Sequence, residues 1–417
     1  MDKELKFTKD EEKEILTILK NKDSNLSVYA AKDENAVYDD NDGYRGSDIY
    51  RGNYDRDIDS ILNNVFYNRF SDKTQVHSFY KNDDVTRRAL HVQFVSRIAK
   101  NIGKILNLNL ELIEAISIGH DMGHTPFGHR GEKFLSALYF NEDKKYFQHN
   151  VHSVKVLRDI SKKESRSDAV KKSRGISLQV LDGILCHNGE FLVDKLQPSK
   201  LKDFKEFEKK YSVCYFDNKA ADKNVANTLE GCLVRICDMI AYIGKDRNDL
   251  FNVKKGDKYN ALQKLDHGLG TKNSTIIKNI ITNLLKNSLN KPYIKLDSSV
   301  TKALDLMKKD NYKIIYDSPE ITREYDVIKI LFERIFNAAI NDLKNGTDKT
   351  YIRKHFIDEL YLKEYKKDVT NGKYTNADIT VDYIACMTDD YLIDLCKEMN
   401  IPEVKKVVYT GYFGKEI

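Results

Sequence analysis

The spacing of apolar residues between Arg88 and Leu106 constrains the fold of this chain more than any other feature of its sequence. Apolar side chains recur there every three or four residues, as they do on one face of an amphipathic helix. The same period returns at residues 328–335, whereas the alternation typical of strands is scarce. Only five of the 417 residues are proline, so few positions interrupt a helix. We therefore predict an all-α fold.

Composition narrows the class of protein. Hydrophobic residues make up 41% of the chain, which allows a sizeable core, and charged residues make up 32%, most of which must lie on a solvated surface. No segment approaches the ~18 uncharged apolar residues of a membrane span. The six cysteines form no CxxC pair, which favours free thiols in a reducing compartment. We expect a cytoplasmic protein with no membrane partner, and a net charge of +5 is compatible with anionic ligands.

Local signals predict where several helices begin. Asn109 precedes an apolar run and is expected to cap the helix that contains it. Asn227 and Glu230 have the spacing of a capping box, for a helix that extends to about Arg247. Other segments are assigned by composition and period: a leading helix at 7–20, a loop at 31–54, a helix around 58–70, charged surface segments at 141–148 and 161–175, exposed helices within 252–312 and a helix-rich block at 317–400.

Histidines and carboxylates mark a candidate metal site. Five of the ten histidines lie between His91 and His149. His91 is on the apolar face of the first amphipathic helix, and the adjacent pair His120–Asp121 ends the next one. Taken alone, His91 is more often a core histidine, and a His–Asp pair is common by chance. Taken together, two imidazoles and carboxylates suit a divalent cation such as Mn, Fe, Ni or Zn.

Five short segments add a more specific signal. The longest is residues 120–132, HDMGHTPFGHRGE. The others are residues 54–57 (YDRD), 73–76 (KTQV), 147–150 (FQHN, with Ser153 following) and 382–389 (DYIACMTD). Taken in chain order, the five segments resemble segments of the HD-domain deoxyguanosine triphosphate triphosphohydrolases. Those family segments read RDRDRI, KTQV, HDLGHPPFGHxGE, FxHNxQS and DYIAGMTD.

This resemblance implies a fold and an activity. It implies an HD-domain helical bundle with a peripheral, mostly helical C-terminal lobe. We accordingly expect an N-terminal helix and polar loop (1–54), a catalytic core (55–250) and a C-terminal region (251–417) that packs on the core. The implied reaction is hydrolysis of deoxynucleoside triphosphates to deoxynucleoside and inorganic tripolyphosphate. The implied cofactor is Mn²⁺ or Mg²⁺, with Fe, Ni, Co and Zn as alternatives.

A later helix supplies the fourth metal ligand that the resemblance implies. Asp238, Tyr242 and Asp246 recur every four residues and so share one helix stripe. On spacing alone this stripe is equally an ordinary polar face. The family pattern DxxAYxxxD implies that Asp238 joins His91, His120 and Asp121 at the metal. It also implies that Tyr242 contacts the substrate and that Asp246 receives the sugar 3′-hydroxyl.

Cationic and acid–base groups complete the expected site. Arg88 lies one turn before His91 and is the candidate clamp for the triphosphate, the alternative being a surface arginine. His129 and Glu132 are three residues apart, a spacing that lets a carboxylate orient an imidazole. By resemblance this pair performs acid–base chemistry. His124 and His149 are expected along the phosphate channel, with a structural capping role as the alternative for His149.

The resemblance implies nucleoside contacts from Arg69 and Phe70, whose alternative roles are an ion-paired arginine and a core phenylalanine. Residues 67–70 (YNRF) and 86–91 (TRRALH) depart from the family's FRRL and RTRLTH. These departures leave the preferred base open.

Partners and rival functions follow from the same segments. The substrate is expected to be a deoxynucleoside triphosphate, and by resemblance the chain forms homo-oligomers, hexamers included, and binds an activating nucleotide. Lysine-rich stretches at 162–174 and 200–210 fit a solvated face better than a site for single-stranded DNA. The rival functions are an HD phosphohydrolase acting on other nucleotides and a non-catalytic regulator that binds nucleotides or nucleic acid.

Overall fold

Helices dominate the protein, as the apolar period predicts. The computed structural model describes residues 7–39, 49–162, 175–188, 193–253, 256–346 and 349–416. In these ranges the strands are β1 (Lys195–Leu196) and β2 (Ile294–Lys295), which pair antiparallel. The prediction of an all-α fold is therefore confirmed. Most of the lysine-rich stretch predicted at 162–174 lies outside the described residues.

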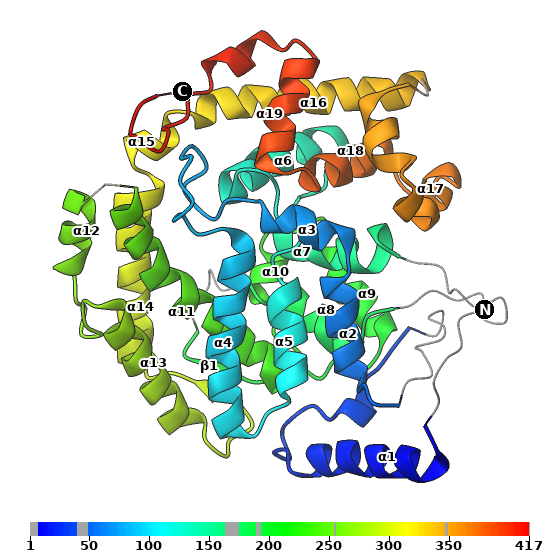
Figure 1. Ribbon diagram of the computed structural model, residues 1–417, viewed down its shortest axis with the longest axis vertical. Helices are drawn as coiled ribbons and strands as arrows, with labels where there is room; N and C mark the ends of the chain where they lie inside the picture. The colour runs from blue at the N-terminus through cyan, green and yellow to red at the C-terminus, as the bar shows by residue number, and fades with distance from the viewer. Residues whose placement is uncertain are drawn as a thin grey trace.

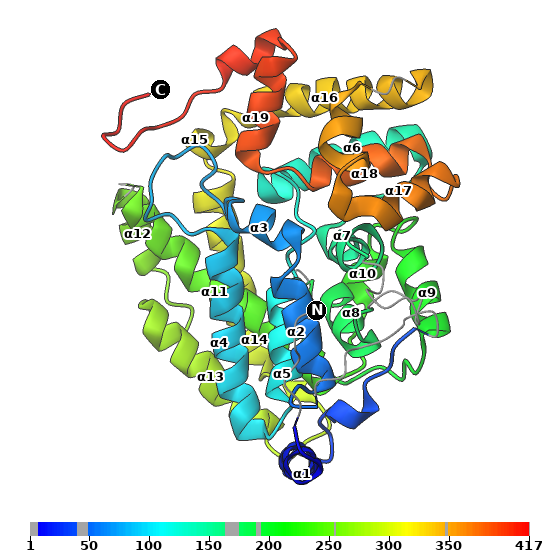
Figure 2. The ribbon, with the colours of Figure 1, turned by 45° about the vertical axis from the view of Figure 1, so that its right-hand side comes forward.

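Six helices form the body around the predicted metal ligands. In Figure 1, α2, α4 and α5 stand side by side, and Figure 2 shows the same neighbours after rotation. α4 packs between α5 and α11, while α8 packs against α5, α7 and α11. The bounds of these helices are α2 (Asn53–Leu62), α4 (Arg88–Leu106), α5 (Leu110–Gly119), α7 (His149–Lys155), α8 (Leu178–Leu185) and α11 (Leu229–Asn252).

The remaining helices surround this body on two sides. α13 (Asn273–Ser288) and α14 (Ser298–Asn311) pack against α11, and α16 (Tyr325–Asn345) and α18 (Asn376–Ala385) cover α6 (Gly128–Asp143) at the top of Figure 1. One cluster of buried apolar side chains continues from Tyr54 to Val404. The other helices are α1 (Lys9–Ser24), α3 (Val65–Ser71), α9 (Phe204–Val213), α10 (Ala220–Lys223), α12 (Gly256–Gln263), α15 (Pro319–Thr322), α17 (Lys363–Thr370) and α19 (Asp389–Glu398). Short 3₁₀ or π turns are η1 (Asp33–Asn35), η2 (Val156–Ile160), η3 (Tyr312–Tyr316), η4 (Arg353–Ile357), η5 (Leu360–Leu362) and η6 (Pro402–Lys406).

One of the two predicted helix caps is confirmed and the other is wrong. Asn109 caps α5 as expected, because its side chain accepts a hydrogen bond from the Leu112 N–H at 3.0 Å. The capping box predicted at Asn227 and Glu230 is wrong. Thr228 Oγ1 accepts the Gly231 N–H at 3.1 Å instead. The Glu230 carboxylate does not accept from Asn227; it accepts from backbone N–H groups of Asn109 and Ala31, which lie far away in the sequence.

Glu230 ties the N-terminal segment to the body. Its Oε1 accepts the Ala31 N–H at 3.1 Å and the Asn109 N–H at 3.0 Å, and the side chain is fully buried. Burial raises the pKa of Glu230 to about 7, although these N–H groups oppose the rise. Between the unfolded value of 4.5 and this folded pKa, the folded state keeps a proton that the unfolded chain has lost. The contribution of Glu230 to stability is therefore lost as the pH rises through that window.

Replacing Glu230 by glutamine should remove this pH dependence, since the amide oxygen still accepts both N–H groups and carries no charge. We expect the free energy of unfolding of Glu230→Gln to rise relative to wild type by about 1–3 kcal/mol between about pH 5 and about pH 8. Urea unfolding of both proteins at the two pH values measures the difference. An offset between the two proteins that is independent of pH would contradict the expected titration.

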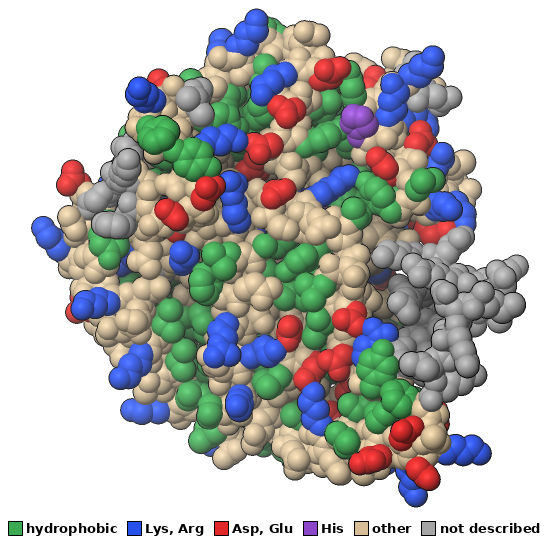
Figure 3. Space-filling model, viewed as in Figure 1, with side chains coloured by type: hydrophobic (Ala, Val, Ile, Leu, Met, Phe, Trp, Pro, Cys, Tyr) green, Lys and Arg blue, Asp and Glu red, His purple; other side chains and the backbone are tan. Residues whose placement is uncertain are grey.

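Surface features agree with the composition. On the face drawn in Figure 3, basic and acidic side chains are interspersed. No helix among the described residues combines the length and the apolar character needed to cross a membrane. The six cysteines are all buried thiols without a disulfide, as predicted.

Candidate active site

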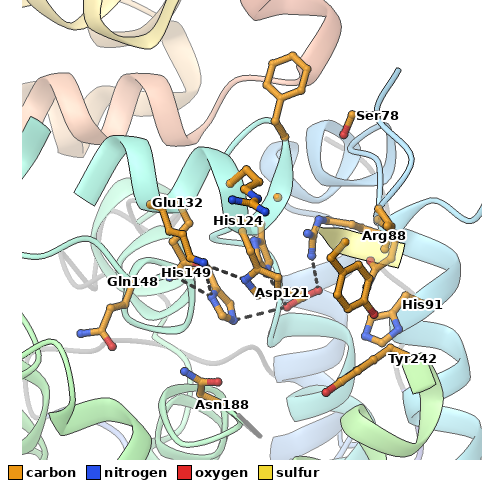
Figure 4. Close-up of a pocket in the computed structure, with 18 of the residues that line it drawn as sticks. Ser78, Arg88, His91, Asp121, His124, Glu132, Gln148, His149, Asn188 and Tyr242 are labelled. Atoms are coloured by element: carbon orange, nitrogen blue, oxygen red, sulfur yellow. Dashed lines mark hydrogen bonds and ion pairs between the residues drawn. The ribbon is translucent and has the colours of Figure 1, made fainter. Parts of the chain in front are cut away.

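A cavity of about 310 Å³ opens where α4, α6, α7 and α11 meet (Figure 4). The loops before α4 and α6 close its sides. Most of the residues predicted from the sequence line it: Arg88, His91, Asp121, His124, His129, Glu132, His149, Asp238, Tyr242 and Asp246. His120 lies directly behind them and is fully buried. Residues that are far apart in the sequence are thus gathered around one cavity.

Two imidazoles and two carboxylates converge on one wall. His91 Nε2 lies 2.8 Å from Asp238 Oδ1. His120 Nε2 lies 3.6 Å from the same oxygen and 3.4 Å from Asp121 Oδ1. Atoms that bind one cation at about 2.1 Å are separated by no more than about 4.2 Å. These spacings suit one divalent cation held by His91, His120 and Asp238, and they place Asp121 beside His120 in an adjoining group with His187.

The environment of His120 supports the same interpretation. Its Nδ1 lies 2.7 Å from the Ser117 carbonyl oxygen and so carries the N–H, which leaves a lone pair on Nε2. Among the described residues this buried Nε2 has no hydrogen-bond partner. Burial opposes protonation of His120, but the Asp121 and Asp238 carboxylates outweigh it and raise its pKa to about 9. Their field therefore favours a positive charge at Nε2.

Asp121 also holds a buried arginine. Arg88 Nη1 donates to Asp121 Oδ2 at 2.8 Å, and Arg88 is only 1% exposed. Despite burial, the charges of His120, His124 and Arg88 hold the pKa of Asp121 well below its usual range. Gly128 makes room for the guanidinium: its φ is +55°, and a Cβ there would lie 2.8 Å from Arg88 Nη2. The cationic clamp expected from the sequence is thus buried beside the ligand carboxylate.

A second group of titratable side chains lies beside the first. Glu132 accepts from His129 Nδ1 at 3.1 Å and from His149 Nδ1 at 3.0 Å. Burial raises the pKa of Glu132, but these imidazoles reverse the effect and hold it well below its ordinary value. The His124 ring stacks on the His149 ring at 4.0 Å. An ionised Glu132 therefore fixes which nitrogen of His129 and His149 carries hydrogen.

His187 is a cavity residue that the sequence arguments missed. It follows α8, and its Nε2 lies 3.8 Å from Asp121 Oδ1 and 3.2 Å from His149 Nε2. No recognised segment contains it. One signal was available, because His187 follows a buried apolar helix in the same way that His120 follows α5.

Tyrosine side chains also line the cavity. Tyr242 and Asp246 both face it from α11, as the four-residue spacing predicts. Tyr316 donates its hydroxyl to the Asp246 carboxylate, and its ring packs edge-on against Tyr312 at 4.9 Å. Burial raises the pKa of Asp246 to about 7. The two C-terminal tyrosines were not identified from the sequence because no segment marks them.

The expected nucleoside contacts Arg69 and Phe70 are not brought to this cavity. Arg69 Nη2 donates to the Tyr361 hydroxyl at 2.6 Å, and its guanidinium lies over the Phe66 ring. Phe70 is fully buried. The alternative of a core phenylalanine matches Phe70, whereas Arg69 is hydrogen-bonded to a tyrosine and not ion-paired as its alternative expected. Gln75, in the loop between α3 and α4, lines the cavity instead.

Three of the five sequence segments meet as one structural unit behind the cavity. Lys73 Nζ donates to the carbonyl oxygens of His124 and Ala385, the latter at 2.7 Å. Asp389 accepts from Thr74 Oγ1 at 2.6 Å and from the Phe127 N–H at 2.9 Å. These segments therefore position the loop that carries Asp121 and His124, in addition to any contact with substrate.

Comparison with known proteins gives consistent matches. Residues 88–242 match the HD domain family and residues 294–398 match the phosphohydrolase-associated domain family. A deoxyguanosinetriphosphate triphosphohydrolase-like protein of Rickettsia felis is 30% identical, over 82% of this chain and 90% of the relative. A protein of the same name from Clostridium tetani is 29% identical, over 85% of this chain and 86% of the relative. A third protein of this name, from Caldanaerobacter subterraneus, is 27% identical over 84% of this chain and 86% of the relative.

Proposed function

Because the chain belongs to the family of deoxyguanosinetriphosphate triphosphohydrolase-like HD-domain proteins, we propose that it hydrolyses deoxynucleoside triphosphates to deoxynucleoside and inorganic tripolyphosphate. Family membership makes the chain a phosphohydrolase of nucleotides. The proposal adds the substrate, the bond that breaks and the residues that act.

One observation carries the proposal: a single cavity is lined by predicted metal ligands and the buried Arg88, and also by tyrosine side chains. The metal ligands and Arg88 suit a polyanion, since a bound cation and the guanidinium N–H groups attract phosphate charge. The tyrosines suit a nucleoside, because their rings offer stacking surface and Asp246 offers an acceptor to a sugar hydroxyl. A deoxynucleoside triphosphate whose nucleoside contacts the tyrosines then presents its α-phosphorus to the metal ligands and Arg88.

A divalent cation held by His91, His120, Asp121 and Asp238 would polarise a phosphoryl oxygen and lower the pKa of a nearby water. Arg88 is fixed by Asp121 and directs its remaining N–H groups at the phosphate charge. The water oxygen bonds to the α-phosphorus while the bond from that phosphorus to the 5′-oxygen breaks. His129, with its Nδ1–H held by Glu132 and a second proton on Nε2, gives the Nε2 proton to the leaving 5′-oxygen, and the proton that the attacking water loses restores it.

His129→Ala tests the proton-transfer role. We expect turnover to fall by about 10²–10⁴-fold, while bound metal and substrate affinity are retained because His129 is not one of the four ligands. Steady-state kinetics, metal analysis and binding of a non-hydrolysable dNTP analogue measure the three quantities. His355→Ala is the matched control, since that histidine is also exposed and contacts Tyr391 outside the cavity. Unchanged turnover in His129→Ala would remove this residue from the chemistry.

Product identification tests the proposed reaction itself. The full chain is incubated with each dNTP and Mn²⁺ or Mg²⁺ in oxygen-18 water, and the products are separated by anion exchange. We expect deoxynucleoside with no label and tripolyphosphate with one labelled oxygen. A nucleoside monophosphate with pyrophosphate would show that a different bond is attacked. Tight dNTP binding without turnover would favour a non-catalytic regulator.

A further inference from the structure

The loop between α3 and α4, residues 72–87, contributes part of the cavity wall. It brings the side chains of Gln75, Val76 and Ser78 to the lining. The buried Gln75 Oε1 has no hydrogen-bond partner among the described residues, so a donor group of a bound ligand can supply one. Ligand binding in the cavity therefore depends on the position of this loop.

Side-chain hydrogen bonds fix three points of the loop. Thr74 Oγ1 donates to a carboxylate at the start of α19 at 2.6 Å, and Thr86 Oγ1 donates to a carboxylate on α11 at 3.0 Å. Between them, Asn82 Nδ2 donates to a carbonyl oxygen at the end of α11 at 3.0 Å. The stretch that lines the cavity, residues 75–81, lies between the first and the last of these points along the chain.

A segment near the C-terminus, residues 407–416, pairs with that stretch, and we call it the strap. The Thr410 N–H donates to the Phe79 carbonyl oxygen at 2.8 Å, and the Lys81 N–H donates to the Thr410 carbonyl oxygen at 2.9 Å. These bonds make a parallel bridge between Tyr80 and Thr410. Figure 1 shows the strap, in red, beside the light-blue loop. The loop therefore has a strand-like partner from the other end of the chain.

Aromatic packing joins the strap to the cavity wall. The Tyr409 ring lies against the buried Phe79 ring, with centroids 6.1 Å apart. Phe79 in turn stacks on Phe127 at 5.7 Å and packs edge-on against Tyr325 at 5.4 Å. Phe127 and Tyr325 both line the cavity. Only one side chain thus separates the strap from two residues of the lining.

The strap is also attached on the side away from the loop. The Val408 N–H donates to Glu324 Oε2 at 3.2 Å, and Glu416 pairs with Arg323 at 3.2 Å. Arg323 and Glu324 directly precede α16. The strap therefore ties the cavity loop to the start of this helix.

We propose that the strap positions the loop for substrate, and that Thr410 is a positioning residue that acts through its two backbone hydrogen bonds. This inference rests on the proposed function in one respect, since it takes the ligand to be a deoxynucleoside triphosphate. With the pairing intact, Gln75 and Ser78 keep their places in the lining. Its loss should lower affinity and leave the chemistry intact, because the predicted metal ligands and His129 come from other segments.

Thr410→Pro tests the pairing. Proline has no N–H to give to the Phe79 carbonyl oxygen, and its ring occupies the place of that hydrogen, so the strap must move off the loop. We expect KM for the dNTP, and the Kd of a non-hydrolysable dNTP analogue, to rise about tenfold, as for the loss of one or two hydrogen bonds. The value of kcat should stay within about twofold of wild type, with metal content unchanged. The conservative Thr410→Ala keeps both backbone bonds and should retain the wild-type affinity.

Amide hydrogen exchange of the wild type tests the same link without a variant that can fail to fold. If the pairing favours binding, binding must favour the pairing by the same factor. We therefore expect the Thr410 and Lys81 amides to exchange about tenfold more slowly when the dNTP analogue is bound.

Three results would overturn the positioning role. They are wild-type affinity in folded Thr410→Pro, equal losses of affinity in Thr410→Pro and Thr410→Ala, and exchange of the two amides that is the same with and without bound analogue. A fall in kcat with loss of metal would also overturn it, because the strap would then support the whole site.

Failure of the proposed function would look different. A chain that binds the analogue in the expected way but hydrolyses no dNTP keeps the positioning role and refutes the proposed reaction. If no dNTP binds, the proposed substrate is wrong, and exchange of the Lys81 amide without nucleotide decides the remaining question. Faster exchange in Thr410→Pro than in Thr410→Ala would show that the strap holds the loop, and equal exchange would overturn it.

Discussion

Asp121→Asn is expected to release bound metal and to lower turnover by at least about 10³-fold, since a metal supplies several kcal/mol of transition-state stabilisation. Asp121 Oδ1 is the acceptor shared by the imidazoles on this wall, lying 3.4 Å from His120 Nε2. An amide in its place brings no negative charge and can turn an N–H group toward the cation. Metal analysis and dNTP hydrolysis measure the two losses.

The asparagine variant is preferable to alanine because Asp121 has a second task. Arg88 is almost fully buried and donates to Asp121 Oδ2 at 2.8 Å. Asparagine leaves Arg88 an acceptor, whereas alanine leaves a buried cation unpaired, which costs about 3–5 kcal/mol. We therefore expect Asp121→Ala to unfold at lower urea concentration than Asp121→Asn.

Asp317→Asn is the matched control for charge removal. Asp317 lines the same cavity but pairs with Arg130 at its rim and is 56% exposed, so metal content should be unchanged. Wild-type turnover by Asp121→Asn with metal measured absent would eliminate the metal from the mechanism.

Gly123→Ala is expected to destabilise the protein by about 3 kcal/mol or more, because it overpacks a rigid contact. A Cβ on Gly123 would lie 2.1 Å from the Ser153 backbone N and 2.4 Å from the His149 carbonyl oxygen. Both neighbours are backbone atoms of α7, so neither can rotate away. The methyl group must push the loop that carries Asp121 off this helix.

Loss of this contact should also weaken metal binding. The Gly123 N–H donates to Ser153 Oγ at 2.8 Å, and the same hydroxyl donates to the His120 carbonyl oxygen at 2.6 Å. Urea unfolding and metal titration measure the two effects. Gly346→Ala is the control: its φ is +66° with no atom near the added Cβ, so it should cost only about 1 kcal/mol. A Gly123→Ala midpoint equal to that of the wild type would show that the loop and α7 are not in tight contact.

The local rules of helix formation were sufficient for parts of the fold. The apolar period predicted α4 over Arg88–Leu106, and Asn109 was identified as the cap of α5 from its position alone. Both depend on neighbours within about four residues, which the sequence displays directly. The capping box at Glu230 failed because its carboxylate found partners near Ala31 and Asn109.

The sequence by itself determined which helix faces carry the predicted metal ligands. Through five recognisable segments it also determined the family. Asp121 and its neighbours could be named because they belong to one such segment. Tertiary structure alone decided which other side chains join them. His187 reaches Asp121 because α8 packs against α5 and α7, and Tyr316 reaches Asp246 because α14 and the turn after it pack beside α11. Arg69 stays away from the cavity because Tyr361, from the far end of the chain, binds it. Such contacts depend on the packing of residues remote in sequence, which no local period encodes.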